Sequence, residues 1–270
     1  MNPGPAARPL AGLGVLVTRP AHQAEPFCDL ITAAGGTPIR FPVIAIEMPT
    51  NTVAAAAVID TLDTFDLAIF ISANAVEQGV AAVRARRDWP ESLVIASIGE
   101  ATAQALIERG LVSAVRPEQR FDSEALLEHP ALCAVAGKRV VIFRGEGGRE
   151  RLAETLRARG AEVVYAEVYR RTLPAVDSAP LRKRWHAGEV GVAVITSAEG
   201  LHNLHALLGP EGSALLSTTP LVVASDRVLQ RAHDLGVGQA ARVARSATDQ
   251  GLFEAVVAWR QAETVGRDQK

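Results

Sequence analysis

The feature that most constrains the fold of this chain is an internal duplication with regular spacing. One unit, A, reads as strand, turn, helix and strand, and it occurs at residues 16–49 and again at 139–174. Each copy precedes a unit B, in which three short apolar strands each lead into a turn and a helix. The spacings in the two B copies agree, because Ser72 lies 27 residues before Gly99 and Ser197 lies 28 residues before Ser225. The order A-B-A-B indicates two related α/β halves.

Alternating strands and helices with short turns predict parallel sheets that are covered on both faces. We therefore expect two doubly wound parallel-sheet domains, with ligands bound beyond the carboxyl ends of the strands. The sequence leaves open whether each A unit pairs with the B unit that follows it or with the other one. The extended segments 37–49 and 162–174 are candidates for crossing connectors. Such connectors would insert one domain into the other, with a cleft between the two.

Composition narrows the class of protein. A chain of 270 residues with 48% hydrophobic content suits two domains of ordinary size. A net charge of −2 and a sequence pI near 6.3 give no general attraction for nucleic acid. The start of the chain lacks the apolar region of a signal peptide, and no run of eighteen apolar residues occurs. We therefore expect a cytoplasmic protein without a membrane partner, and a monomer, since few apolar residues look committed to a subunit interface.

The turn that opens the second A unit suits an anion. Gly145 and Gly147 follow an apolar strand and precede a helix, so backbone N–H groups and a helix N-terminus converge there, flanked by arginines at 144, 149 and 151. The turn is also half of a dinucleotide-binding fingerprint, but Glu150 stands at the third glycine position. The sequence contains no phosphate-binding P-loop, no H-E-x-x-H motif and no cysteine–histidine cluster, so we expect neither a nucleotide bound in a P-loop nor a built-in metal.

Three further polar side chains are candidates for chemistry. Ser72 and Ser197 lie in turns without a G-x-S-x-G elbow, which favours helix capping over nucleophilic catalysis. Tyr169 is one of only two tyrosines and stands at the exit of the second A unit. Its hydroxyl either reaches the surface from an ordinary strand or faces the ligand, and the sequence leaves both open. A phenol hydrogen-bonded to a leaving hydroxyl assists its departure without a cofactor.

Six segments, in order and with matched spacing, resemble the uroporphyrinogen-III synthase family. The resemblance implies two doubly wound domains joined by a two-stranded connector, with a cleft between them. It implies one discontinuous domain of residues 1–40 and 174–270, and a second, inserted domain of residues 44–170. The segments are LVTRP at 16–20, FISANAV at 70–76, IGEATAQALIERG at 98–110, RGEGGRERL at 144–152, EVYRR at 167–171 and ITSAEGL at 195–201.

The resemblance also implies a reaction. Hydroxymethylbilane, a linear tetrapyrrole, loses its hydroxyl as water and closes to uroporphyrinogen III with ring D inverted, through a spiro intermediate, in heme and siroheme biosynthesis. The enzyme implied is a cofactor-independent hydro-lyase and cyclase that needs no metal, with a possible transient contact to hydroxymethylbilane synthase. A substrate with eight carboxylates fits a chain with many helix N-termini.

Family positions carry over residue by residue. Tyr169 matches a tyrosine proposed to assist loss of the hydroxyl. Many relatives have an I-G-x-x-T-A turn in the second B unit, whereas this chain has Ser225-Asp226-Arg227, so we expect Arg227 to bind a propionate instead. The other positions that match the substrate-binding edge are Thr18, Arg19, Ser72, Asn74, Gly99, Glu100, Thr102, Arg144, Gly145, Gly147 and Ser197.

Two rival functions remain at this level. One is a non-catalytic cytoplasmic two-domain binding protein for a small polyanion, which would use the same turns without chemistry. The other is an NAD-dependent dehydrogenase, for which the chain supplies only half of the expected glycine loop. Turnover separates the first rival from an enzyme, and dependence on the nucleotide tests the second.

Overall fold

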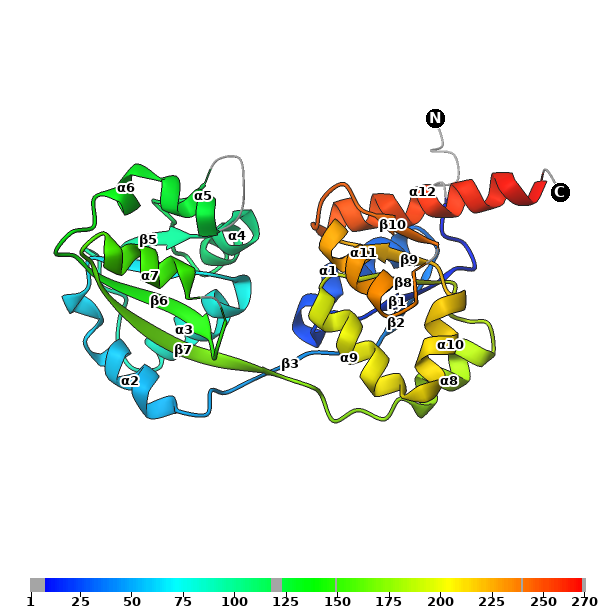
Figure 1. Cartoon of the computed structure of the whole chain (residues 1–270), viewed down its shortest axis with the longest axis horizontal. Coiled ribbons are helices and arrows are strands. Elements are labelled where there is room, and N and C mark those ends of the chain that lie inside the picture. Colours follow the sequence, from blue (N-terminus) through cyan, green and yellow to red (C-terminus); the bar gives the residue numbers. More distant parts are fainter. Residues whose placement is uncertain (1–7, 118–122, 149, 239, 269–270) are drawn as a thin grey trace, which may run out of the picture. The chain divides into compact units, whose positions relative to one another are not determined.

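Two separate parallel sheets organise the chain (Figure 1). The computed structural model describes residues 8–117, 123–148, 150–238 and 240–268. Unit 1 contains the described residues up to Ala45 and those from Thr172 on, and unit 2 is Ile46–Arg171. The chain passes from one unit to the other within β3 (Ala45–Glu47) and at the end of β7 (Glu162–Thr172), and these two strands are neighbours in the sheet of unit 2. The expected two-domain α/β class is confirmed.

The sheet of unit 1 has the strand order β10-β9-β8-β1-β2, and all its neighbours run parallel. The two central strands of this sheet lie far apart in the sequence, because β1 pairs with β8 and places Val15 opposite Val192. The bounds are β1 Gly14–Val17, β2 Thr37–Arg40, β8 Val192–Ile195, β9 Leu221–Val223 and β10 Ala241–Val243.

The sheet of unit 2 has the order β3-β7-β6-β4-β5, and its neighbours β7-β6, β6-β4 and β4-β5 run parallel. Here β4 (Leu67–Phe70) and β6 (Arg139–Gly145) form the central parallel pair, and β5 (Val94–Ser97) lies beyond β4. Each A unit therefore pairs with the B unit that does not follow it, which resolves the alternative left open by the sequence. The expected strand at 114–116 is reduced to one bridge between Val115 and Ala96. Pro117 has no N–H with which to extend that ladder.

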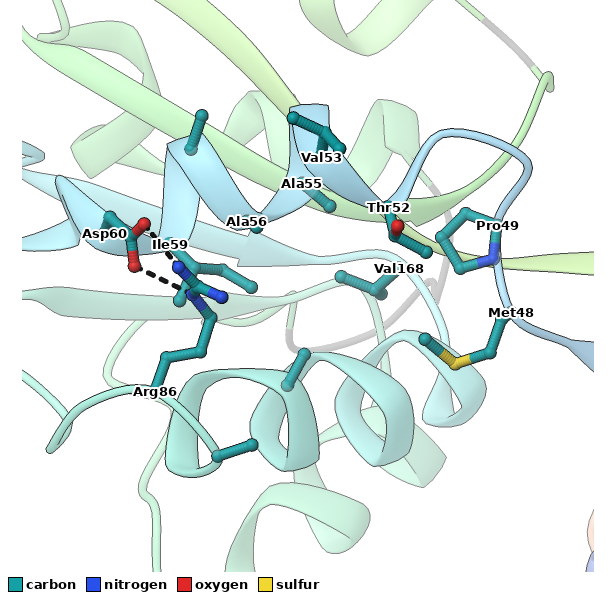
Figure 2. A pocket seen from close by; sticks show the side chains of 13 residues that line it. Met48, Pro49, Thr52, Val53, Ala55, Ala56, Ile59, Asp60, Arg86 and Val168 are labelled. Atoms are coloured by element: carbon teal, nitrogen blue, oxygen red, sulfur yellow. Dashed lines mark hydrogen bonds and ion pairs between the residues drawn. The ribbon is translucent and has the colours of Figure 1, made fainter.

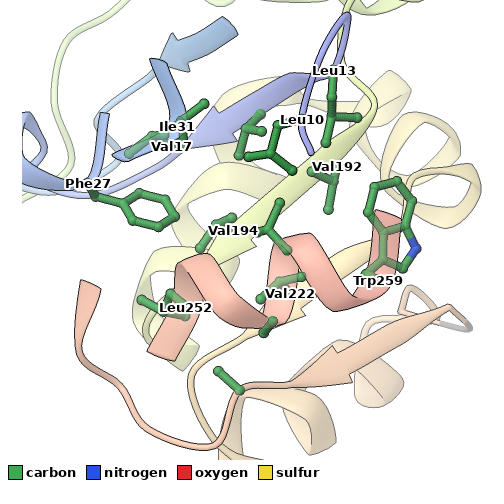
Figure 3. Close-up of a cluster of buried hydrophobic side chains, with 14 of the residues drawn as sticks. Leu10, Leu13, Val17, Phe27, Ile31, Val192, Val194, Val222, Leu252 and Trp259 are labelled. Atoms are coloured by element: carbon green, nitrogen blue, oxygen red, sulfur yellow. The ribbon is translucent and has the colours of Figure 1, made fainter. Parts of the chain in front are cut away.

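Helices cover both faces of the unit 1 sheet. Successive strand residues point to opposite faces, so Val15 and Val17 join one core while Leu16 joins the other. Figure 3 shows the first core, in which Leu252 and Trp259 of the long C-terminal helix pack beneath the strands. The helices are η1 Ala21–Gln23, α1 Glu25–Ala33 and α12 Asp249–Asp268, and, around the second core, α8 Ala179–His186, α9 Ala198–Leu208, α10 Pro210–Thr218 and α11 Asp226–Asp234.

Unit 2 is layered in the same way, with an aromatic stack at its centre. The rings of Phe70 and Phe143 lie 4.6 Å apart and nearly parallel. Helices α2 (Thr52–Asp60), α3 (Ala73–Arg84) and α4 (Glu100–Ile107) cover this face. The other face carries α5 Ser123–Glu128, α6 Pro130–Cys133 and α7 Arg151–Ala158, and η2 Leu62–Thr64 follows α2. Across the described ranges, no helix has the length and apolar character that crossing a membrane requires.

The packing of α12 makes a direct test of the unit 1 core. Leu252 is fully buried against the sheet, so Leu252→Ala leaves a cavity and should lower the free energy of unfolding by about 2–5 kcal/mol. Urea denaturation followed by circular dichroism measures the loss. Glu254→Ala, an exposed position on the same helix, is the control and should change it by less than about 0.5 kcal/mol. A loss below about 1 kcal/mol for Leu252→Ala would contradict the packing.

Candidate functional site

The strands of each sheet end in register, so the turns that follow them share one edge. Phe70 lies opposite both Phe143 and Ser97, and in unit 1 Val17 lies opposite Val194. The residues expected from the sequence therefore form two sets, one at or just beyond the carboxyl edge of each sheet. Unit 1 has Thr18, Arg19, Ser197 and Arg227, and unit 2 has Ser72, Asn74, Gly99, Glu100, Thr102, Arg144, Gly145, Gly147 and Tyr169.

A pair of hydroxyl groups marks the edge in unit 2. The Tyr169 hydroxyl and the Ser72 Oγ lie 3.1 Å apart, at the ends of β7 and β4. Ser72 is half-buried and also accepts a hydrogen bond from the Ala75 N–H, which confirms its expected role as the cap of α3. The Tyr169 side chain is only 3% exposed and packs with the aromatic core, so it is not a strand aromatic with its hydroxyl at the surface.

A β-bulge aims Tyr169 at Ser72. Arg144 pairs with Glu167 but Gly145 pairs with Tyr169, so Val168 is one extra residue in β7. Without the bulge, strict alternation would send Tyr169 to the same face as Tyr165. Gly145 gives the ring its space, because a Cβ there would lie 2.7 Å from the ring of Tyr169.

The turn after β6 is built around a buried arginine. The Arg144 side chain is 2% exposed and its guanidinium donates to the carbonyls of Gly145, at 3.2 Å, and Gly147. It also donates to Glu150 at 2.9 Å. The sequence suggested that Arg144 flanks the turn, whereas the structure puts it behind the turn. Arg149 lies outside the described residues, and Arg151 opens α7 in an ion pair with Glu124 at 3.1 Å.

Glu150 and Tyr165 complete this network. The Arg144 guanidinium lies 4.4 Å from the centre of the Tyr165 ring, and the Tyr165 hydroxyl donates to the second oxygen of Glu150. These bonds, that of Tyr165 first and that of Arg144 second, hold the pKa of Glu150 below its usual value. Burial, and then the Glu150 carboxylate, raise the pKa of Tyr165. The sequence analysis treats Glu150 only as the residue at the third glycine position, and no local signal identifies it as the partner of Arg144, because the burial of Arg144 depends on packing.

The edge in unit 1 is also tied together by side chains. The Thr18 hydroxyl is buried and donates to the Val194 carbonyl at 3.0 Å, across the central strand pair. Arg19 forms an ion pair with Asp249 at the start of α12 and lies over the Phe27 ring at 5.5 Å. Sequence reasoning missed Asp249, since nothing local links residues so far apart. The Ser197 Oγ accepts from the Gly200 N–H at 2.9 Å, which confirms it as the cap of α9.

The helices α4 and α11 at these edges begin without a side-chain cap. Gly99, which precedes α4, has no side chain, and Ser225, which precedes α11, makes no cap hydrogen bond, so the first N–H groups suit an anion. Glu100 and Arg227 are exposed in the first turns of these helices. Asn74 and Thr102 lie in the first turns of α3 and α4 and are buried, at 8% and 4% exposure.

A cavity of about 610 Å³ lies elsewhere in unit 2, between α2 and α3 (Figure 2). Its lining is mostly alanine and other apolar side chains, and none of the expected site residues contributes to it. Asp60 and Arg86 close one end, but they bind each other through two hydrogen bonds of 2.8 and 2.6 Å. Such a lining suits an apolar molecule rather than an anion, so the strand edges remain the candidate site for an anion. Among the described residues, no three histidine, cysteine, aspartate or glutamate side chains gather as a metal site would require.

Comparison with known proteins gives one consistent family. A family model described as Uroporphyrinogen-III synthase HemD matches residues 25–254. The chain is 36% identical over 247 residues to the uroporphyrinogen-III synthase of Salmonella typhimurium and 34% identical to that of Escherichia coli, and each alignment covers 90% of this chain and all of the relative. That of Synechococcus elongatus is 31% identical over 270 residues, which covers 96% of this chain and all of the relative.

Two solved structures share the fold. A mutant uroporphyrinogen III synthase from the extremely thermophilic bacterium Thermus thermophilus aligns with a TM-score of 0.60 and 20% identity, covering 93% of this chain and 99% of that one. A uroporphyrinogen-III synthetase from Helicobacter pylori aligns with a TM-score of 0.58 and 12% identity, covering 91% and 98%. At these identities the likeness concerns the fold alone.

The network behind the glycine turn predicts a pH effect on stability. Because folding lowers the pKa of Glu150, its ionised form stabilises the folded state above the unfolded pKa of about 4.3, and this contribution is lost as the pH falls through the folded pKa. We expect the free energy of unfolding of Glu150→Gln to fall less steeply between about pH 5 and pH 3 than that of the unsubstituted chain. Urea denaturation across that range measures the slopes. Glu154→Gln, an exposed carboxylate one turn later, is the matched control, and equal slopes for Glu150→Gln would contradict the network.

Proposed function

This chain belongs to the uroporphyrinogen-III synthase family, and on that premise we propose that it closes hydroxymethylbilane to uroporphyrinogen III, with loss of water and inversion of ring D. The observation that carries the proposal is the hydroxyl pair of Tyr169 and Ser72 at the carboxyl edge of unit 2. The pair supplies a hydrogen-bond donor for the leaving hydroxyl, and the helix N-termini of both edges supply donors for carboxylates.

The bonding of the pair leaves one proton to donate. Two hydroxyls carry two protons, and their mutual hydrogen bond uses one of them. The Ser72 oxygen already accepts from Ala75, so either direction of the mutual bond is possible. If Tyr169 donates to Ser72, the serine proton is available to the substrate. If Ser72 donates to Tyr169, the phenol proton is available.

The proposed reaction needs positioning more than strong acid catalysis. Electron donation from the terminal pyrrole nitrogen breaks the C–O bond of the hydroxyl. The group takes up the free proton of the hydroxyl pair as it departs, so it leaves as water, and the proton released at the end of the reaction restores the pair. The substituted carbon of ring D then attacks the azafulvene end, and rearrangement of the spiro intermediate releases a proton, so the net loss is one water. Holding the two ends together makes inversion faster than simple closure.

We further propose that Thr18, Arg19, Ser197 and Arg227 at the strand edge of unit 1 bind substrate carboxylates. At the strand edge of unit 2 we propose the same role for Asn74, Gly99, Glu100 and Thr102. Backbone N–H groups and hydroxyls are the donors, and Arg227 adds a charge where family members have a threonine turn. One chain would act alone in the cytoplasm and receive its substrate in a transient contact with hydroxymethylbilane synthase.

The product isomer tests the proposal. Hydroxymethylbilane is generated by a purified deaminase, this protein is added with a chelator and without cofactor, and uroporphyrins I and III are separated after oxidation. We expect mostly type III. Only type I, the product of spontaneous closure, from a folded preparation would refute the proposal and favour a polyanion-binding protein.

The hydroxyl pair predicts graded losses of turnover. Tyr169→Phe removes one hydroxyl of the pair and should lower kcat about 10²-fold. Ser72→Ala keeps the phenol but loses its partner and the cap of α3, so we expect a kcat loss of about tenfold and a stability loss of about 1 kcal/mol. Steady-state rates and urea denaturation measure these effects. A Tyr169→Phe enzyme with unchanged kcat would contradict the catalytic role.

The proposed role of Arg227 predicts that its substitution weakens the affinity for the substrate. If it binds a propionate, Arg227→Ala should raise KM about tenfold and leave kcat nearly unchanged. Arg184→Ala is the charge-matched control, because Arg184 pairs with Glu189 at 2.6 Å near the start of β8, at the opposite edge of the sheet. Equal KM values for the two variants would remove Arg227 from the site.

A further inference from the structure

We propose that Arg144 is a positioning residue that acts from behind the turn 145–148, and that it does not contact substrate. Its side chain would orient the N–H groups of the turn toward a substrate carboxylate and keep Tyr169 bonded to Ser72. This inference rests on the proposed function. It assigns Arg144 a role different from the substrate contact that family resemblance implies.

The first argument is that all three nitrogens of the guanidinium already donate hydrogen bonds within the protein. Its side chain is 2% exposed and lines a cavity of only about 130 Å³ between the sheet and α7. It donates to two carbonyls of the turn and to Glu150, and Glu167 lies 3.9 Å from its Nε. One flat side of the guanidinium faces the Tyr165 ring. Each of the three guanidinium nitrogens thus already donates to a protein acceptor, so a bond to a substrate carboxylate would have to replace one of these bonds.

The second argument is the direction of the backbone. Because the Gly145 and Gly147 carbonyls point at the guanidinium, the N–H groups of the same two peptides, those of Glu146 and Gly148, are directed away from it. Gly147 and Gly148 have φ values of +69° and +105°, which glycine adopts without strain. Neither of these two glycine N–H groups is hydrogen-bonded to another residue in the described part of the chain. Successive free N–H groups in such a turn form a concave anion-binding site.

The third argument connects Arg144 to the hydroxyl pair. Gly145 packs directly against the Tyr169 ring, and the next residue, Glu146, donates its N–H to the Tyr169 carbonyl at 2.8 Å. The Glu146 carboxylate accepts in turn from Thr50, whose hydroxyl lies 3.0 Å away. The turn therefore contacts both the ring and the backbone of Tyr169, and the hydrogen bonds of Arg144 fix the conformation of the turn.

The need for arginine follows from geometry. A planar fork with five donors can serve two carbonyls and a carboxylate at once, while it stacks on an aromatic ring. Lysine keeps the charge but presents a single ammonium group, so it cannot maintain the same set of bonds. The charge itself is balanced by Glu150 and Glu167, without which its burial would be costly.

Arg144→Lys provides the test. A substrate contact would lose affinity, so KM would rise while kcat stayed nearly constant. A positioning residue should instead lower kcat about tenfold with KM changed less than about threefold, and type I should rise as a share of product because spontaneous closure competes. A rise in KM alone would overturn the proposal.

A double-mutant cycle with Tyr169→Phe measures the coupling between the two kcat losses, which general destabilisation of the protein would not change. If Arg144 acts through Tyr169, Arg144→Lys should cost little further kcat once the phenol hydroxyl is gone. Additive losses would show that Arg144 acts independently and would overturn the proposal. Glu150→Gln removes the negative charge beside the guanidinium and one of the two acceptor oxygens that Arg144 and Tyr165 use. It should give a smaller loss of the same kind, and it replaces Arg144→Lys if that variant does not fold.

Amide hydrogen exchange keeps this test separate from that of the proposed function. In Arg144→Lys the Glu146 amide and its neighbours in 144–148 should exchange faster, while strand β8 of unit 1 stays as protected as before. Unchanged exchange in 144–148 would overturn the inference. If the unsubstituted protein forms no type III product, the proposed function fails by itself, and exchange then decides alone whether Arg144 holds the turn.

Discussion

Both units depend on hydrogen bonds between strands that lie far apart in the sequence. In unit 1, β1 is completed by β8, and in unit 2, β4 is completed by β6. Neither central pair forms between consecutive strands, so a large loop must close before its contacts stabilise the sheet. The stabilising free energy that offsets this cost comes from burying two apolar faces per sheet, each of which is covered by helices. The two passages of the chain between the units are the direct consequence of this pairing.

The same central pairs position the polar groups. Neighbouring helices leave the sheet to opposite faces at this point, so the turns diverge and expose backbone N–H groups at the edge. Thr18 bonds across the pair in unit 1, from the end of β1 to the Val194 carbonyl. In unit 2 the hydroxyl of Tyr169 reaches Ser72 past Gly145, at the corresponding edge. The duplication therefore places chemically different groups at equivalent points of two similar sheets.

Exposed and buried arginines contribute differently to this structure. The pair of Asp60 and Arg86 is half exposed, so solvent weakens it and its loss would matter little for stability. Arg144 is enclosed, and each of its bonds replaces one that water would otherwise provide. A buried guanidinium with several partners fixes backbone direction, which a surface ion pair cannot do. This difference is why an arginine behind a turn can govern groups that it never contacts.

The sequence alone determined the duplication, the α/β class and the turns in which nearly all candidate site residues lie, because periodicity, glycine spacing and capping residues are local signals. The family followed from the resemblance of six segments. The sequence did not determine which A unit joins which B unit, since hydrophobic strands of similar length pair equally well on pattern alone. It also placed Arg144 beside its turn rather than beneath it, because burial of a charge depends on partners such as Glu150 and Tyr165 that only packing brings together. The clearest case is Tyr169. Alternation along β7 predicts the opposite face for Tyr169, and the extra residue of β7 in its pairing with β6 turns the hydroxyl to Ser72. A bulge belongs to a pair of strands, so one strand read by itself does not contain it.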